Sequence, residues 1–384
     1  MFQKSRKFLG LVSILSVALF AFSACVERTS TTDGTVTIEG PVKVGAIMPL
    51  TGDGAAYGVP LQKVAEIALA KSNAAGGVQM EFIWEDGKCN GQDAASAIQK
   101  LINVDGVQVV YGAFCSSETL GAAPIAEAAG VVMLSPGSSS PDITNAGDYI
   151  FRNYPSDSSQ AAVLGNLASF VNVTKLGTIT EENDYTIGLE KVFIETFEAN
   201  GGEVVAESFL ATDTDFKTQI TKLKGEGIDG IFINPQTPPK ADLILKQLQE
   251  LGLEEGTVIF VNDVIMGYQA GIDQYTELLE GAYGAQASYD ANSAAFQSME
   301  AEYSAANNGE AVPFKTYAAT SYDAVFLLAE AFNTVGNNAD AIRDWLYDVS
   351  NWPGTAGLLT IDSNGDPESG HKAQMITGGE VVDI

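Results

Sequence analysis

Histidine is almost absent from this 384-residue chain, and cysteine and basic residues are scarce. The one histidine, His371, has no partner in the sequence that would orient it for acid–base catalysis, so we expect it to lie on the surface. The sequence has no G-x-S-x-G elbow, no H-E-x-x-H motif, no Walker loop and no cysteine cluster. We therefore expect no enzymatic activity, no cofactor and no metal. A carboxylate pair among the many acids stays open as an alternative.

The charge balance is strongly acidic. The chain has 49 Asp and Glu residues against 20 Lys and Arg, which gives a formal net charge of −29. Such a chain repels phosphates and anionic lipids, which argues against nucleic acid or an anionic membrane surface as a partner. With 46% hydrophobic residues, the composition is that of a globular protein, and the length suits two lobes better than one small domain.

The first residues have the pattern of an export signal. A basic stretch precedes the apolar run at residues 8–22, and the small residues Ser23 and Ala24 follow it. The run is short and interrupted by serines, which makes a retained transmembrane helix the weaker interpretation. We therefore expect residues 1–24 to be a signal peptide.

The cysteine after these small residues resembles the lipidated cysteine of bacterial lipoproteins. Cys25 would then be the first mature residue and carry the lipid, with Phe22 where a leucine is usual. Residues 25–41, which are rich in Ser and Thr, would form a lipid-anchored flexible tether. The protein is thus expected in the periplasm or on the outer face of the cytoplasmic membrane, anchored through Cys25.

Two cysteines remain for the body of the protein. An exported chain meets an oxidising compartment, which favours a disulfide between Cys89 and Cys115. Two free buried thiols are the alternative, and the spacing alone does not exclude it.

Strands and helices alternate along the rest of the chain. A first series begins with an apolar strand at residues 42–50 and a helix at 55–75. A second series begins after a polar segment, with a helix at 160–170 and a strand at 176–180. Repeated strand–helix units predict α/β architecture with two doubly wound parallel-sheet lobes. The cleft between two such lobes is the default binding site.

The stretch at residues 107–144 has the strongest site signal. Two short apolar strands, 107–110 and 131–134, are each followed by a hydroxyl-rich turn, at 115–118 and 135–140. In an open α/β sheet such turns lie at the carboxyl ends of the strands, where ligands bind. Free N–H groups beside serine hydroxyls suit a carboxylate. Helix capping is the alternative role for any one of these serines.

With these features the chain resembles the periplasmic branched-chain amino-acid binding proteins, which are type I solute-binding components of ABC importers. The resemblance extends over nearly all of the mature chain, and its most specific blocks are CSSET and PGSSSP. Further matching blocks are VKVGAIMPLTGDGAAYG, FRNYPSDSSQAA, TDTDFKTQITKLKGEGIDGIFI and GLLTIDSNGD.

The resemblance implies two lobes joined by three crossings, near Asp157, Gln286 and Asp366. The N-terminal lobe would contain residues 42–157 and 287–365, and the C-terminal lobe residues 158–286 and 366–384. The family's early disulfide matches Cys89 and Cys115. The acidic loop at 362–366 resembles a calcium loop, but Pro367 and Ala373 stand where such a loop needs Gly and a bidentate acid. We therefore expect a turn there.

The resemblance also implies an amino-acid site between the lobes. Hydroxyls and backbone N–H groups of the first lobe would hold the ligand's carboxylate, at Ser116, Gly137, Ser138 and Ser139. One aromatic residue from each lobe would cover the aliphatic part, at Tyr57 and Tyr185. An acid of the second lobe, Asp263, would hold the ammonium with charge-assisted strength.

The sequence departs from the family pattern in this second lobe. Thr186 follows Tyr185 where the family often has Gly, and Thr237 aligns with an aromatic residue of leucine binders. If Val264 rather than Asp263 occupied the place of the acid, the ligand would lack an ammonium, as amides and urea-like solutes do. The expected ligand is therefore an amino acid or a similar small polar solute.

These features predict an extracytoplasmic receptor that delivers its solute to an ABC permease and ATPase complex. One alternative is a ligand-sensing module that signals to a membrane partner, although the sequence has no fused signalling domain. The other is an exported amidase or hydrolase on a similar frame, which no nucleophile or metal motif supports.

Overall fold

A computed structural model describes residues 30–32, 35–253 and 255–384. The expected signal peptide and Cys25 lie outside the described residues. Within the expected tether, β1 (Ser30–Thr32) and β2 (Thr35–Thr37) pair as antiparallel strands, so this part has regular structure that we did not predict. Among the described residues, no helix is long and apolar enough to span a membrane.

The first lobe is built on a five-stranded sheet with the order β4-β3-β5-β6-β7, whose neighbours all pair in parallel. Its strands are β3 (Val42–Met48), β4 (Met80–Asp86), β5 (Val109–Tyr111), β6 (Val132–Ser135) and β7 (Ile150–Arg152). After Lys43, every residue of β3 is buried, as expected for a strand covered on both faces.

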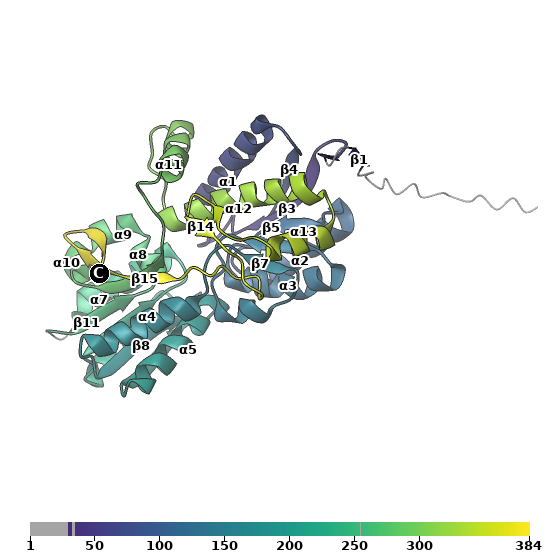
Figure 1. The fold of residues 1–384 in the computed structure, drawn as a ribbon. Helices are drawn as coiled ribbons and strands as arrows, with labels where there is room; N and C mark the ends of the chain where they lie inside the picture. Colours follow the sequence, from purple (N-terminus) through teal and green to yellow (C-terminus); the bar gives the residue numbers. More distant parts are fainter. Residues whose placement is uncertain (1–29, 33–34, 254) are drawn as a thin grey trace, which may run out of the picture.

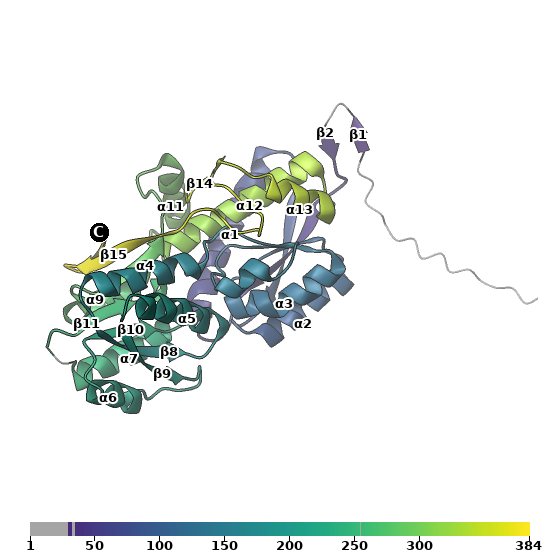
Figure 2. The same ribbon diagram turned by 60° about the horizontal axis from the view of Figure 1, so that its bottom comes forward.

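Helices cover both faces of this sheet (Figures 1 and 2). They are α1 (Ala55–Ala75), α2 (Gly91–Lys100), η1 (Leu101–Asp105), α3 (Ser116–Ala129), η2 (Pro141–Asn145), α11 (Ala294–Ala306), α12 (Lys315–Val335) and α13 (Ala339–Tyr347). Val44 and Ala46 belong to the core that includes α1 and α12, while Ile47 belongs to the core under α2 and α3. This alternation follows from side chains pointing to opposite faces along a strand. The lobe also contains the short strands β13 (Trp352–Pro353) and β14 (Leu358–Leu359).

The second lobe has a seven-stranded sheet with the order β16-β15-β12-β11-β10-β8-β9. Its strands are β8 (Lys175–Glu181), β9 (Glu203–Phe209), β10 (Gly230–Asn234), β11 (Val258–Val261), β12 (Tyr283–Ala287), β15 (His371–Thr377) and β16 (Glu380–Asp383). Strands β15 and β16 run antiparallel at one end, and the others pair in parallel. Its helices are α4 (Asp157–Phe170), α5 (Asp184–Ala199), α6 (Lys217–Gly225), α7 (Pro238–Leu251), α8 (Asp263–Met266), α9 (Gln269–Gln274) and α10 (Thr276–Leu279). The prediction of two α/β lobes with parallel sheets is confirmed.

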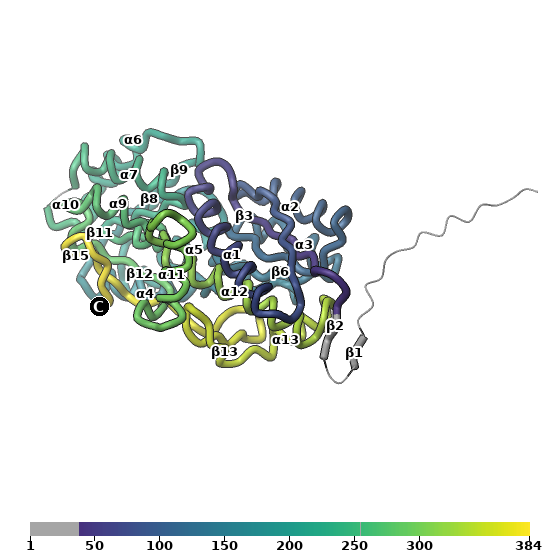
Figure 3. Tube along the Cα trace, turned by 90° about the horizontal axis from the view of Figure 1, so that it is seen from above, coloured from purple at the N-terminus to yellow at the C-terminus, as the bar shows by residue number. Residues whose placement is uncertain are grey.

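The chain passes between the two sheets after β7, after β12 and between β14 and β15. Figure 3 shows the two lobes side by side, with the second lobe on the left and the first on the right. Asp157 is the first residue of α4, Gln286 lies within β12, and Asp366 lies between β14 and β15. The residue limits of the lobes inferred from the resemblance stay a prediction.

Candidate functional site

The two serine-rich turns meet at the carboxyl ends of β5 and β6. The first turn starts α3, with Ser116 as its first residue, and Ser116 is buried. The Oγ atom of Ser116 accepts hydrogen bonds from the backbone N–H groups of Ser139 (3.2 Å) and Ser140 (3.1 Å) in the second turn. Because two N–H groups already occupy its oxygen, the hydroxyl proton of Ser116 is free to be donated to a ligand.

Ser138 faces the protein rather than the space between the lobes. It is fully buried, and its hydroxyl lies 3.0 Å from the carbonyl oxygen of Phe114 and 2.7 Å from the hydroxyl of Thr119. Its backbone N–H donates to the hydroxyl of Ser135 at 2.9 Å. Ser138 therefore holds the turn in shape.

A small cavity lies between the lobes beside these turns, and we call it the ligand cavity. Its lining residues are Tyr57, Phe114, Cys115, Ser116, Gly137, Ser139, Tyr185, Gln236, Val264 and Tyr317. Its water-accessible volume is ≈ 30 Å³, which is room for about two water molecules. Of the eight predicted ligand-binding residues, the structure brings five to this lining: Tyr57, Ser116, Gly137, Ser139 and Tyr185.

Thr237 and Asp263, like Ser138, are not among the lining residues. Thr237 is the buried residue that precedes α7 as its N-cap. Its neighbour Gln236 lines the cavity instead, and the backbone oxygen of Gln236 accepts a hydrogen bond from the hydroxyl of Tyr57 at 3.4 Å.

Asp263 is fully buried and accepts hydrogen bonds from the hydroxyls of three tyrosines. Tyr185 (2.5 Å) comes from the second lobe, as Asp263 does, while Tyr154 (2.8 Å) and Tyr317 (2.5 Å) come from the first lobe. Burial, and then the charge of Asp263, raise the pKa of each tyrosine well above its ordinary value. The hydroxyls therefore stay protonated and join the lobes by donating to one carboxylate.

The start of α8 explains why neighbouring residues face different surroundings. Asn262 is the N-cap of this helix, and its side-chain oxygen accepts from the backbone N–H of Ile265 at 3.4 Å. Asp263 and Val264 are then the first two helical residues, so their side chains point about 100° apart. Asp263 faces the tyrosines and Val264 faces the ligand cavity.

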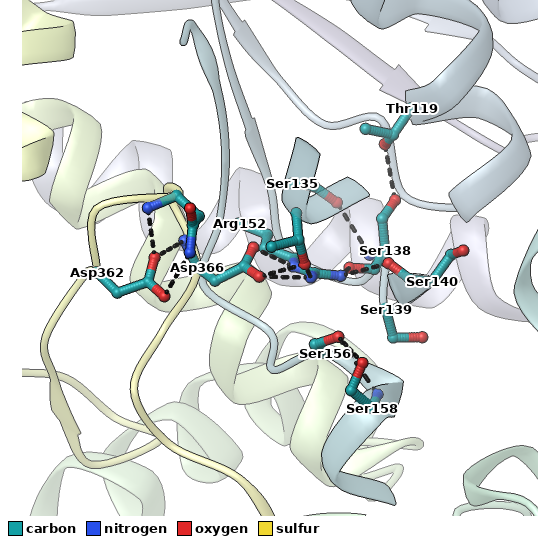
Figure 4. A network of polar contacts seen from close by, with 12 residues as sticks. Thr119, Ser135, Ser138, Ser139, Ser140, Arg152, Ser156, Ser158, Asp362 and Asp366 are labelled. Carbon is teal, nitrogen blue, oxygen red and sulfur yellow. Dashed lines mark hydrogen bonds and ion pairs between the residues drawn. The ribbon is translucent and has the colours of Figure 1, made fainter. Parts of the chain in front are cut away.

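Arg152 connects the second serine turn to the third crossing, between β14 and β15, through hydrogen bonds and an ion pair (Figure 4). Its guanidinium is fully buried and donates to both carboxylate oxygens of Asp366, at 2.6 Å and 2.7 Å. It also donates to the backbone oxygen of Ser140 at 2.8 Å. In the same loop, Asp362 accepts backbone hydrogen bonds from Asn364 (2.7 Å) and Asp366 (3.0 Å), which is the turn expected there.

A second buried acid, Asp157, lies beside the second serine turn. Asp157 is fully buried, and its backbone N–H donates to the backbone oxygen of Ser139 at 2.8 Å. Burial, and then the charge of Asp263, raise the pKa of its carboxyl well above the usual value. Burial therefore favours the protonated, neutral form of Asp157.

His371 was expected on the surface, and this expectation is wrong. It is only 8% exposed because it begins β15, which lies within the second lobe's sheet and packs against α4. Its Nδ1 atom lies 2.6 Å from the hydroxyl of Ser159, and its ring meets Tyr154 edge-on at 5.9 Å. Burial lowers the pKa of His371 to about 4.

This buried histidine is expected to make stability depend on pH. The folded state keeps it neutral down to about pH 4, whereas the unfolded chain binds a proton below about pH 6.5. Stability is therefore lost as the pH falls through this window, by about 2 kcal/mol between pH 7.5 and 5. Urea unfolding of the wild type and His371→Gln at both pH values measures the effect. Identical pH dependence of the two proteins would contradict it.

A disulfide borders the cavity. Cys89 and Cys115 are joined, with their Cα atoms 5.1 Å apart, which ties the loop after β4 to the start of α3. Beneath it, the buried carboxyl of Glu118 accepts backbone hydrogen bonds from Cys89 and Cys115, both at 2.9 Å. Burial raises the pKa of Glu118 to about 7. Because Cys115 lines the cavity, this bridge supports the first serine turn.

Comparisons with known sequences identify the family of this chain. The sequence matches the periplasmic binding protein family over residues 41–378. A Pseudomonas aeruginosa leucine-, isoleucine-, valine-, threonine- and alanine-binding protein is 33% identical over 219 residues, which cover 56% of this chain and only 58% of that protein. A second P. aeruginosa relative, described as an amino acid binding protein, is 28% identical over 317 residues, or 79% of this chain and 82% of that protein.

Solved structures share the fold. The branched-chain amino acid transporter substrate binding protein of Streptococcus pneumoniae, in complex with isoleucine, is 31% identical with a TM-score of 0.77, covering 90% of this chain and 100% of that chain. A leucine binding protein of Thermotoga maritima is 25% identical with a TM-score of 0.80, covering 89% of this chain and 97% of that chain. The family predicted from the sequence is confirmed: the chain belongs to the periplasmic binding protein family and has the type I fold of its branched-chain amino-acid-binding members.

Proposed function

We propose that this protein captures a small α-amino acid between its lobes and delivers it to an ABC permease and ATPase complex. The observation that carries the proposal is the polarity of the ligand cavity. The hydroxyl of Ser116 and the turn at Gly137 and Ser139 stand on the first-lobe side, and the buried carboxylate of Asp263 stands behind Tyr185. A zwitterion needs donors at one end and an anion at the other.

In this proposal the ligand's ammonium displaces tyrosine hydroxyls from Asp263, and its carboxylate receives the proton of Ser116. The cavity of ≈ 30 Å³ is too small for an amino acid, so the lobes open to admit it. The ligand then favours the closed form because it contacts both lobes at once, and the closed form is what the permease recognises. The amino-acid-binding relatives described above support an amino acid as the ligand, and we propose no catalytic step. We also propose that export is followed by lipid anchoring at Cys25.

A thermal-shift screen tests the proposal directly. The soluble chain from residue 27 onward is heated with amino acids, amides, urea, short peptides and small carboxylates. A ligand that binds only the folded state stabilises it by about 2.7 kcal/mol at a hundredfold excess over Kd. We expect shifts with small aliphatic amino acids. If only amides shift the melting temperature, the proposed contact between Asp263 and an ammonium is wrong. If none of the compounds shifts it, the proposal is overturned.

Ser116→Ala is expected to weaken binding of the amino acid identified by the screen. Loss of a hydroxyl that donates to a carboxylate costs about 1–2 kcal/mol, or roughly 5- to 30-fold in Kd. Ser96→Ala is the control, since Ser96 lies on α2 of the same lobe, donates to the backbone oxygen of Gln92 at 2.9 Å and is not among the lining residues. Calorimetric titration of both variants measures the difference. Equal affinities would remove Ser116 from the carboxylate site.

A further inference from the structure

One ion pair joins the two lobes across the cleft. Lys240 lies in the first turn of α7 in the second lobe, and its Nζ atom is 4.0 Å from Oδ2 of Asp53, in the turn between β3 and α1 of the first lobe. Among the ion pairs between described residues, only this one connects the two lobes away from the crossings. We propose that Lys240 is a positioning residue for ligand binding, because its pairing with Asp53 holds the lobes closed over the ligand cavity. This inference rests on the proposed function.

The surroundings of Lys240 are unfavourable for a cation unless carboxylates neutralise it. Its side chain is only 6% exposed, and the burial of an ammonium group is costly. Lys240 is also the third residue of α7, whose first turn contains no acid, and the helix dipole disfavours a positive charge at this end. A lysine in this place therefore needs negative charge close by.

Two carboxylates, one from each lobe, supply this charge. Glu181 ends β8 of the second lobe and is 2% exposed. Burial raises the pKa of its carboxyl, whereas the backbone N–H of Gln236 and the charge of Lys240 oppose that rise. The charge of Asp53 adds to the rise, so all three charged groups lie close enough to act on one another. When the lobes separate, Lys240 keeps Glu181 but loses Asp53.

The ion pair lies on the side of the cleft away from the crossings. In the first sheet, β5 and β6 separate β3, which precedes Asp53, from β7, which leads to the first crossing. In the second sheet, β11 separates β10, which precedes α7, from β12, which leads to the second crossing and pairs with β15 after the third. When the lobes rotate about the crossings, contacts far from them separate most. The pair therefore forms only on closure and opposes opening.

The ion pair is connected to the ligand cavity through Glu181. The Oε2 atom of Glu181 accepts a hydrogen bond from the backbone N–H of Gln236 at 2.8 Å. The backbone oxygen of Gln236 in turn accepts from the hydroxyl of Tyr57, on α1 of the first lobe. Gln236 and Tyr57 both line the ligand cavity. Closure of the ion pair thus goes together with the contact that joins these two lining residues.

The first test compares the affinity of Asp53→Asn with that of the wild type. The Asp53 side chain is 57% exposed, so its substitution should leave folding intact. Both proteins are titrated by calorimetry with alanine and with leucine. We expect Asp53→Asn to bind about two- to fivefold more weakly, which is the range for a partly exposed ion pair. The difference should shrink at high salt, because ions screen the pair.

Glu250→Gln is the matched control for this titration. Glu250 also lies on α7, but it pairs with Lys217 of the same lobe at 3.0 Å. Its substitution removes one carboxylate without breaking a contact between the lobes, so the affinity should equal that of the wild type. A loss as large as that of Asp53→Asn would mean that net charge, rather than the pair, sets the affinity.

A double-mutant cycle tests whether Lys240 is the partner of Asp53. In a Lys240→Met background, Asp53→Asn should cost no further affinity, because the ammonium is already gone. An unchanged cost in that background would overturn the inference. If Lys240→Met does not fold, Lys240→Gln takes its place in the cycle, since it keeps a donor for the backbone oxygen of Asp213, which Lys240 binds at 2.9 Å.

Closure is also measured without a ligand. Nitroxide labels at Lys63→Cys and Leu210→Cys, exposed sites on opposite lobes, report the distance between the lobes by pulsed electron paramagnetic resonance. In the chain from residue 27 onward the native cysteines form the disulfide, so only the new thiols react. We expect Asp53→Asn to lower the ratio of closed to open protein by about two- to fivefold.

The two readouts separate the inference from the proposed function. An unchanged ratio of closed to open protein in Asp53→Asn, or a wild type with no closed population, would overturn the role of Lys240 whatever the ligand. A lowered ratio in a protein that binds neither alanine nor leucine would retain that role and count against the proposed function alone.

Discussion

Asp263→Asn is expected to weaken binding of a zwitterionic amino acid by about 30-fold or more. The carboxylate is fully buried, so in the proposed complex it forms a desolvated charge pair with the ligand's ammonium. Removing one charge of such a pair costs about 2 kcal/mol or more. For the corresponding amino-acid amide, which keeps the ammonium, the loss should be as large, whereas a neutral amide such as urea should lose little. Calorimetric titration with the three ligand types measures this pattern.

Asp242→Asn is a suitable control for this experiment. Asp242 also accepts a hydrogen bond from a tyrosine, Tyr268 at 3.0 Å, but it is not among the residues that line the ligand cavity. Its substitution should leave the affinity unchanged. Wild-type affinity of Asp263→Asn for the zwitterion would move the ammonium contact to another group, with buried Asp157 as the next candidate.

Arg152→Met is expected to destabilise the folded protein by about 3–5 kcal/mol. The substitution leaves the carboxylate of Asp366, which is only 7% exposed, without the guanidinium that neutralises it. An uncompensated buried charge has a cost of this size. Equilibrium unfolding in urea measures the change, and the double substitution Arg152→Met with Asp366→Leu should recover most of the loss, since it removes both charges.

A surface pair provides the comparison for this prediction. Arg343 binds Asp344 at 2.7 Å, but the two side chains are 25% and 67% exposed. Arg343→Met should therefore change stability by no more than about 1 kcal/mol. If Arg152→Met proved as mild as Arg343→Met, the Arg152 network would not hold the third crossing in the way described above.

The fold and the first half of the site were predictable because their signals are local. Apolar strands such as the one at Val42 alternate with helices at regular spacing, and the serine turns directly follow β5 and β6. Parallel strands bring such turns to one edge of a sheet without further information. Ser116 and Ser139 were therefore found together, even though 23 positions separate them along the chain.

The remaining parts depend on contacts between distant segments. Tyr317 lies inside α12, 54 positions from the Asp263 carboxylate that it binds, and its sequence neighbourhood is that of an ordinary buried helix. His371 is buried through its place in the sheet, which a lone histidine on a short strand does not reveal.

The segments that build the two lobes alternate along the chain, and this alternation limits the order in which the lobes can fold. The second lobe's sheet needs β15 and β16, which follow the first lobe's α12 and α13 along the chain, and α12 packs on α1 across more than two hundred positions. Neither lobe is a continuous piece of the polypeptide, so each lobe is completed only after much of the other lobe has been made. Contacts of such long range are slow to form. The two lobes of a nascent chain therefore cannot lock together before β15 and β16 have been made.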